Sequence, residues 1–352
     1  MEKNYNTTAQ VPVKEKKCPY RTINMNTYTH DIMPEEMASF RSGGRVQSGY
    51  KNLDAVTNMY PGLYVLGAIS SLGKTTFSHQ MCDQMAEAGH HVLFFSLEQN
   101  ALELASKSLS RIMAKKDATK AMTSLEIRKS ENDERVKAAV DEYSGFTDNV
   151  TVIECSFSMT MDDIVQCVKE YIERNKVTPI VIVDYLQVIQ APENSRMTTK
   201  DLVDSHVRRL KKLQSENKLV LIAISSLNRQ NYMTQIDYES FKESGGIEYT
   251  ADVVWGLQLQ VLSTDEIFDK QGSINEKREV IKKAKAANPR KVELVCLKNR
   301  FGISSYTCAF DYYPQFDLFI PDMTGVKTDE NADPDGFMQL PAGMEDDCPF
   351  KH

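Results

Sequence analysis

The sequence predicts an α/β fold with a mostly parallel central sheet, helices on both faces of that sheet, and additional strands at one edge. Between Gly49 and Ser226, short apolar runs alternate with longer helical stretches. The apolar runs are continuous rather than alternating, which is typical of parallel strands covered on both faces. After Ser226 a long polar loop is followed by strand-like runs with few helices between them. We interpret these later runs as antiparallel strands added at an edge.

The expected strands are short and rich in apolar residues. They are LYVLGA (63–68), HVLFFS (91–96), VTVIEC (150–155), PIVIVDY (179–185) and LVLIAISS (219–226), followed by DVVWGLQLQ (252–260), VELVCLK (292–298) and SSYTCAFD (304–311). The expected helices among the first five strands are residues 75–89, 101–116, 159–175 and 199–217. Residues 274–291 contain seven basic and two acidic residues, and we expect a solvated surface helix there.

Both ends of the chain differ from the middle. Residues 1–45 are polar and are expected to form an N-terminal arm with one short helix near residues 34–41. Residues 46–320 are expected to form the main domain, and residues 321–352 an acidic, disordered tail. Eight acidic residues and one basic residue lie between Asp322 and Asp347, so the net charge of −7 belongs to the tail. The neutral remainder excludes a broad basic face but permits a local track for nucleic acid.

Composition also limits the class of protein. No apolar run is long enough to cross a bilayer, and the N-terminus lacks an apolar signal region, so we expect a cytoplasmic protein with no membrane partner. The seven cysteines are scattered without a CxxC pair, which favours buried thiols over disulfides or a zinc site. Residues 345–350 (EDDCPF) look like the tail peptide of bacterial single-strand binding proteins, although we favour a solubilising tail.

The strongest functional signal is GAISSLGKTT, residues 67–76, which lies between an expected strand and an expected helix. Such a loop turns successive backbone N–H groups toward an anion, and the helix adds its positive N-terminus. We therefore expect a site for ATP or another nucleoside triphosphate with Mg²⁺. The expected nucleotide contacts are Gly67, Ala68, Ser70, Ser71, Gly73, Lys74, Thr75 and Thr76. The strict motif has glycine in place of Ala68, and the alternative is an incidental Gly-Lys-Thr turn.

Two acidic residues follow other expected strands. Asp184 ends the most apolar strand, where a carboxylate could hold the metal together with the hydroxyl of Thr75. Glu98 follows the strand at 91–96 and could polarise the attacking water as a general base. From the residues alone, Asp184 could instead cap the next segment, and Glu98 could be an ordinary acid in the first turn of a helix.

Seven segments together resemble a known family. SGYKNLDAV, GAISSLGKTTF, FFSLE, VDYLQVI, SSLNR, ESGGIEYTADVV and LKNRFG occur in this order between Ser48 and Asp311. The chain is similar to the C-terminal motor domain of DnaB-type replicative helicases, and this resemblance implies a RecA-like P-loop NTPase fold. Alanine at the position of Ala68 is common in that family.

The resemblance also implies roles for individual residues. Lys298 and Arg300 would reach into the nucleotide pocket of the next subunit, where Arg300 would act as an arginine finger. Ser226 occupies a position where the family usually has a glutamine that senses the γ-phosphate, so a bridging water is needed. Single-stranded DNA would bind loops in a central pore. The candidate DNA contacts are Arg196, Lys200, Lys242, Gly245 and Gly246.

The function expected from these features is an ATP-dependent DNA helicase motor that hydrolyses NTP at the subunit interfaces of a homo-hexameric ring. A primase, a loader or a single-strand binding protein would be its partner. We expect a motor without the family's N-terminal helical collar domain, either standing alone or as one half of a split system. Two alternatives are a RecA-type ATPase that loads or remodels proteins on DNA without unwinding, and a weakly active nucleotide-binding scaffold suggested by Ser226.

Overall fold

The computed structural model describes residues 23–43, 45–69, 71–156, 158–191, 196–228, 233–241, 245–264 and 274–328. The chain separates into two units, residues 1–44 and residues 45–352. In the first unit, the described residues form α1 (Met25–Thr27), a short π-helical segment η1 (Tyr28–Ile32) and α2 (Met33–Gly43). The helix expected near residues 34–41 is therefore present, within α2.

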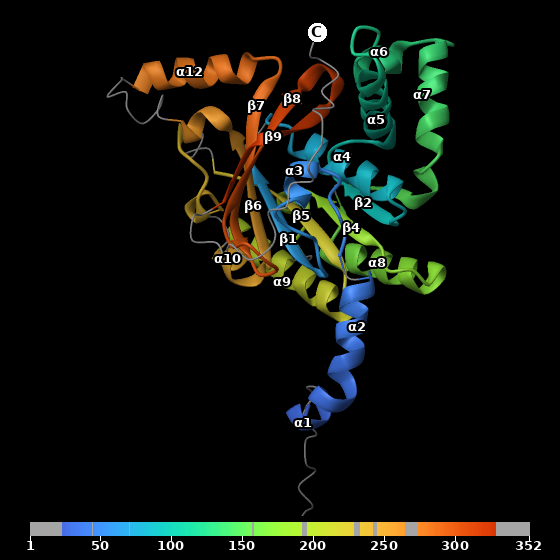
Figure 1. Ribbon diagram of the computed structural model, residues 1–352, viewed down its shortest axis with the longest axis vertical. Helices are drawn as coiled ribbons and strands as arrows, with labels where there is room; N and C mark the ends of the chain where they lie inside the picture. Colours follow the sequence, from blue (N-terminus) through green and yellow to red (C-terminus); the bar gives the residue numbers. More distant parts are fainter. Residues whose placement is uncertain are drawn as a thin grey trace, which may run out of the picture. The chain divides into compact units, whose positions relative to one another are not determined.

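A nine-stranded sheet forms the centre of the second unit, with the order β3-β2-β4-β5-β1-β6-β7-β8-β9 (Figure 1). Its strands are β1 (Gly62–Ala68), β2 (Val92–Ser96), β3 (Val150–Glu154), β4 (Ile180–Asp184), β5 (Val220–Ser226), β6 (Val253–Leu259), β7 (Arg290–Asn299), β8 (Tyr306–Tyr313) and β9 (Leu318–Thr328). The first six strands are parallel, and β7 to β9 are antiparallel. This confirms the predicted α/β fold with added edge strands.

Helices cover both faces of the sheet (Figure 1). On one face α4 packs over β1, β2 and β4, and α5 packs against α4; on the other, α9 packs over β1 and β5, with α8 and α10 beside it. The α-helices of the second unit are α3 (Lys51–Asp54), α4 (Lys74–Glu87), α5 (Ala101–Lys116), α6 (Ser124–Lys129), α7 (Glu134–Ser144), α8 (Met161–Asn175), α9 (Thr199–Asn217), α10 (Gly245–Thr250) and α12 (Ile274–Ala286). Short 3-10 turns are η2 (Thr147–Asn149), η3 (Leu186–Val188), η5 (Tyr238–Phe241), η6 (Gln260–Ser263) and η7 (Pro314–Phe316).

Two predictions at the C-terminal side of the domain need correction. The expected strand at 252–260 was grouped with the antiparallel strands, but β6 pairs parallel to β1, with Tyr64 opposite Val253. The chain between β5 and β6 is long enough for the crossover that a parallel pair requires. The tail was expected to begin at residue 321, but β9 pairs with β8 as far as Thr328. Residues 329–352 of the expected tail lie outside the described residues.

A cluster of aromatic rings fixes the N-terminal half of α4 against the antiparallel strands. The ring of Phe77 stacks on Tyr50 with centroids 4.6 Å apart and meets Phe310 and Phe319 edge-on at 5.3 and 5.2 Å. Tyr50 also donates a hydrogen bond from its hydroxyl to the Phe77 carbonyl at 3.0 Å. All four rings are fully buried. Because aromatic pairs contribute beyond the area that they bury, this cluster holds the start of α4 in a defined place.

The charged helix predicted near residues 274–291 is α12, in which Ile281 is the one described residue that is buried. Its basic side chains Arg278, Lys282 and Lys283 are exposed. The prediction of a solvated surface helix is therefore confirmed. No described helix is both long and apolar enough to cross a membrane.

Candidate active site

The loop predicted to bind phosphate connects β1 to α4, as expected. Ser71 and Gly73 have positive φ angles of 66° and 89°, which turn the backbone sharply before the helix begins at Lys74. A side chain at Gly73 would bring its Cβ within 3.0 Å of the Tyr312 and Phe319 rings. Glycine is therefore required there by both conformation and space. The first N–H groups of α4 have no partner within the helix and can bind an anion.

The other predicted loop residues are placed as follows. Gly67 lies in β1, where an added Cβ would be 2.3 Å from the Phe241 ring, so glycine allows η5 to pack directly on the strand. Ala68 ends β1 and is buried. Ser70 lies outside the described residues.

Lys74 projects from the start of α4 toward the carboxyl end of β5. Its Nζ donates a hydrogen bond to Ser226 Oγ at 2.9 Å and lies 4.5 Å from the centroid of the Tyr185 ring. Ser226 pairs with Ala68, the last residue of β1, so both residues lie at the same sheet edge. The structure thus brings together Lys74 and Ser226, both of which are expected in the phosphate site.

Asp184 ends β4 at this same edge, opposite Ser96 in β2. It is 1% exposed, and its Oδ1 has no hydrogen-bond partner among the described residues. Burial raises the pKa of the carboxyl from 3.8 to about 6, while a hydrogen bond from the Thr75 side chain and the charge of Lys74 act in the opposite direction. A buried carboxylate oxygen without a partner, beside a threonine hydroxyl, fits a divalent cation that takes its remaining ligands from phosphate and water. The described residues contain no group of three or more His, Cys, Asp or Glu side chains that could hold a metal ion.

Asp184→Asn should raise the melting temperature of the metal-free protein at pH 8. The folded-state pKa of about 6 lies above the ordinary value of 3.8, so protonation favours the folded state. That stabilisation is complete below about pH 4 and is lost as the pH rises through about 6. Asparagine has the same shape and stays neutral, so the variant does not lose this stabilisation as the pH rises. Thermal melts in a chelator at pH 8 and pH 4.5 check this, since the gain should shrink at the lower pH. A lower melting temperature for the variant at pH 8 would contradict the account.

Glu98 is exposed and lies two residues beyond Ser96, the end of β2. Burial raises the pKa of Tyr185, and the Glu98 charge and hydrogen bond raise it further. Glu98 and Asp184 therefore flank Tyr185 at the carboxyl edge of the sheet. The capping box that begins α5 is formed by Asn100 and Glu103, so Glu98 is not part of it. The role of Glu98 as a general base stays a prediction.

The side chain of Thr76, another expected nucleotide contact, is bonded within the chain. Its hydroxyl is buried, donates to Asp317 Oδ1 at 3.1 Å and accepts from Lys107 Nζ at 3.2 Å. Lys107 also forms an ion pair with Asp317 at 3.4 Å. The Thr76 side chain thus fixes α4 to α5 and to the residue that precedes β9, which leaves its backbone N–H as the group that could contact phosphate.

Two residues near the site were not found from the sequence. Gln187 in η3 accepts a hydrogen bond from the Ser226 N–H at 3.1 Å and donates to Ser225 Oγ at 2.9 Å. A glutamine amide therefore does lie beside Ser226, supplied by the VDYLQVI segment. Arg290, at the start of β7, donates to the Ser71 carbonyl of the phosphate loop at 2.8 Å. Arg290 was missed because the sequence analysis included it in the charged helix expected at 274–291, whereas α12 ends at Ala286 and β7 begins at Arg290.

Lys298 and Arg300 lie near the start of the parallel strands β1 and β6, at the opposite end of these strands from the phosphate loop. Asn299 pairs with Val253 at the start of β6, and the Phe301 ring fills the space beside Gly62 at the start of β1. The phosphate loop follows the other end of β1, about 20 Å away at roughly 3.3 Å per residue. Arg300 therefore cannot reach the phosphate site of its own subunit.

The predicted DNA contacts are only partly described. Arg196 precedes α9 and Lys200 lies in its first turn, and both are exposed, whereas Lys242 lies outside the described residues. Gly245 begins α10, and the N–H of Gly246 donates to Asp204 Oδ1 of α9 at 2.9 Å. The Gly246 amide therefore already has a partner within the chain.

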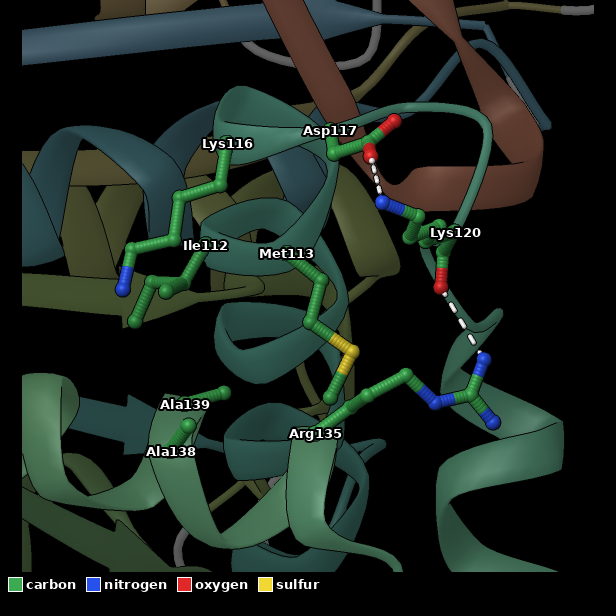
Figure 2. Close-up of a pocket in the computed structure, with 8 residues that line it drawn as sticks. All are labelled: Ile112, Met113, Lys116, Asp117, Lys120, Arg135, Ala138 and Ala139. Carbon is green, nitrogen blue, oxygen red and sulfur yellow. Dashed lines mark hydrogen bonds and ion pairs between the residues drawn. The ribbon is translucent and has the colours of Figure 1, made fainter.

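A separate cavity of about 180 Å³ lies between α5 and α7, away from these residues (Figure 2). Ile112, Met113, Ala138 and Ala139 form its apolar part. Its charged lining residues are already engaged: Lys120 pairs with Asp117 at 3.1 Å, Arg135 pairs with Asp133 at 2.6 Å, and Lys116 pairs with Glu142. None of the predicted site residues lines this cavity.

The chain is similar to known proteins over the residues that carry this geometry. The family model described as DnaB-like helicase C terminal domain matches residues 45–319. The replicative DNA helicase DnaB of Haemophilus influenzae is 29% identical over 231 residues, which cover 64% of this chain and 48% of that protein. The DnaB of Buchnera aphidicola subsp. Schizaphis graminum is 26% identical over 291 residues, which cover 77% of this chain and 57% of that protein. The chain spans about half the length of these curated relatives.

Solved structures agree on the fold. One of them, described as an ATPase domain, superposes with a TM-score of 0.65 at 21% identity and covers 83% of this chain and 98% of that one. A DnaB-like replicative helicase, described together with its interactions with primase, gives a TM-score of 0.64 at 21% identity and covers 86% of this chain and 67% of that one. The sheet and its helices thus have the architecture of these two proteins.

Proposed function

Because this chain belongs to the family of DnaB-like helicase C-terminal domains, we propose that it is the motor of an ATP-driven DNA helicase that works as a ring. The observation that carries this proposal is the division of the site between two edges of one sheet. At the carboxyl ends of the parallel strands lie Lys74, Thr75, Asp184 and Glu98, whereas Arg300 lies at the amino ends of the same strands, which we call the amino edge of the sheet. An intact hydrolytic site then requires two subunits, each supplying a different edge.

Each residue has a distinct task in this proposal. The loop N–H groups and Lys74 bind the β- and γ-phosphates. Thr75 and Asp184 hold Mg²⁺, which when bound neutralises charge between the phosphates. Glu98 accepts a proton from the attacking water, and Arg300 of the neighbouring subunit stabilises charge on the transferred phosphoryl group. Gln187 and Ser226 lie beside Lys74, where their hydrogen bonds would change with the state of the γ-phosphate.

The proposed partners follow from the family and from the position of the loops. Single-stranded DNA is the track, contacted by Arg196 and Lys200 near the start of α9. A homo-hexameric ring is the assembly that places the amino edge of one sheet beside the carboxyl edge of the next. Primase is a candidate partner, because one structural neighbour is described with primase.

A forked-duplex unwinding assay with and without ATP, beside a light-scattering measurement of mass, tests this function. We expect ATP-dependent strand separation by a species of six subunits. Hydrolysis stimulated by single-stranded DNA without strand separation would favour an ATPase that loads or remodels proteins on DNA.

A further inference from the structure

One buried carboxylate, that of Asp252, connects Arg300 to the strand that leads into the phosphate loop. Asp252 immediately precedes β6 and is 4% exposed. Its Oδ2 accepts hydrogen bonds from the Leu63 N–H in β1 at 2.8 Å and from Lys211 Nζ of α9 at 2.5 Å. Its Oδ1 accepts from Arg300 Nη1 at 3.1 Å. Three elements that are distant in sequence therefore meet at one side chain.

The backbone of Asp252 repeats the same connections. Its carbonyl accepts a hydrogen bond from the Arg300 N–H at 3.1 Å, and its own N–H donates to the Leu63 carbonyl at 2.9 Å. The turn that carries Arg300 is thus fixed to β6 and β1 through main-chain bonds, and the guanidinium is fixed by the carboxylate. Phe301 anchors the same turn by packing 5.7 Å from the Tyr60 ring and 6.0 Å from the Tyr64 ring, centroid to centroid.

The Arg300 side chain remains accessible although one end of it is held. It is 52% exposed, and its ion pair with Asp252 uses Nη1. Among the described residues, the other guanidinium N–H donors have no side-chain partner, so they are available to a group outside the subunit. A long side chain that is bonded at one nitrogen and open at the others loses less freedom when it binds a second anion, because its direction is already set.

We propose that Asp252 is the positioning residue for Arg300, and that it aims the arginine at the nucleotide of the neighbouring subunit. The inference rests on the proposed function. Asp252 lies at the amino edge of the sheet with Arg300, so it contacts no nucleotide in its own subunit. Its effect on hydrolysis passes through Arg300 and is felt in the next subunit.

A purely structural role makes a different prediction. The carboxylate also holds Leu63, so its loss could disturb β1 and thereby the phosphate loop of the same subunit. If the carboxylate positions Arg300, its loss impairs the nucleotide pocket of the neighbouring subunit. If the carboxylate only supports β1, its loss impairs the pocket of the same subunit. The two roles can be separated by mixing subunits.

The experiment combines Asp252→Asn with Lys74→Ala in one assembly and measures ATP turnover. Alone, Asp252→Asn should lower turnover by roughly 10²-fold, the effect of a misplacement of about 1 Å, and Lys74→Ala should be inactive. In an equal mixture, about a quarter of the interfaces join an intact Asp252→Asn pocket to a correctly aimed arginine from a Lys74→Ala subunit. We expect turnover to recover toward about that fraction of the wild-type value.

A matched mixture of Arg300→Ala with Lys74→Ala separates this inference from the function on which it rests. If the Arg300→Ala mixture recovers turnover and the Asp252→Asn mixture does not, the role of Asp252 is structural and the inference is wrong. If neither mixture recovers, Arg300 does not act across the interface, and the proposed function fails together with the inference.

Two further variants serve as controls, one for misfolding and one for the contribution of Lys211. Asp252→Ser removes the carboxylate but keeps a small polar side chain, and it replaces Asp252→Asn if that variant does not fold. Lys211→Met removes the second cation while the Arg300 pair remains, and turnover should stay within about twofold, as is usual for a partly exposed ion pair. A loss of turnover with Lys211→Met as large as that with Asp252→Asn would overturn the assignment to Arg300.

Discussion

Lys74→Ala should abolish nucleotide binding. Lys74 projects from the first turn of α4 toward Ser226 and Tyr185, where the anion cradle of the loop lies. Charge-assisted bonds from one ammonium to two phosphates are among the strongest that the site can form, so affinity should fall by roughly 10²-fold or more. Calorimetric titration with a non-hydrolysable ATP analogue and Mg²⁺ measures the change.

The matched control for this variant is Lys291→Ala. Lys291 is an exposed lysine of β7 that pairs with Asp311 at 2.6 Å, and its removal should leave affinity unchanged. Alanine favours helix at the start of α4, so the melting temperature of Lys74→Ala should stay close to that of the wild type. Retention of full affinity by Lys74→Ala would mean that the loop is an ordinary turn.

Arg300→Ala should lower turnover by roughly 10³-fold while the affinity for nucleotide stays nearly intact. The arginine lies at the opposite end of β1 from its own phosphate loop, so its loss leaves the phosphate-binding residues of that subunit in place. The fold should also tolerate the change, because Asp252 keeps its bonds to Lys211 and Leu63. Steady-state hydrolysis and calorimetric titration of the same preparation separate the two effects.

Arg278→Ala is the corresponding control, since Arg278 is an exposed arginine of the charged surface helix α12. Its turnover should equal that of the wild type. Unchanged turnover in Arg300→Ala would remove the arginine from the reaction, and a large fall in affinity would show that it binds the nucleotide in the ground state instead of acting on the transferred phosphoryl group.

Most of the sheet could be predicted because its strands carry a strong local signal. Continuous apolar runs such as 180–183 are typical of parallel strands buried on both faces, and the helices α5 and α9 begin and end where their sequence patterns do. The helices α6 and α7 were not predicted. They pack with α5 in a small separate cluster, so they are not part of the alternation of strands and covering helices on which the prediction rested. The strand β9 was missed because a glycine, a proline and an acidic residue interrupt its apolar pattern.

The site was predictable to the extent that its residues follow strand ends. Asp184 and Glu98 could be found because neighbouring parallel strands place their carboxyl ends together. The role of Gln187 could not be found, since its position beside Ser226 depends on the turn after β4 and not on sequence spacing. Asp252 was likewise hidden, because its three partners lie in elements that only the folded sheet brings together.

The central claim is that one subunit supplies the phosphate cradle and the next supplies the arginine. Turnover per subunit, measured over a dilution series while mass is followed by light scattering, tests it most directly. The account predicts that hydrolysis disappears as the assembly dissociates, although single subunits still bind nucleotide. A dissociated subunit that hydrolyses ATP as fast as the assembled protein would contradict it.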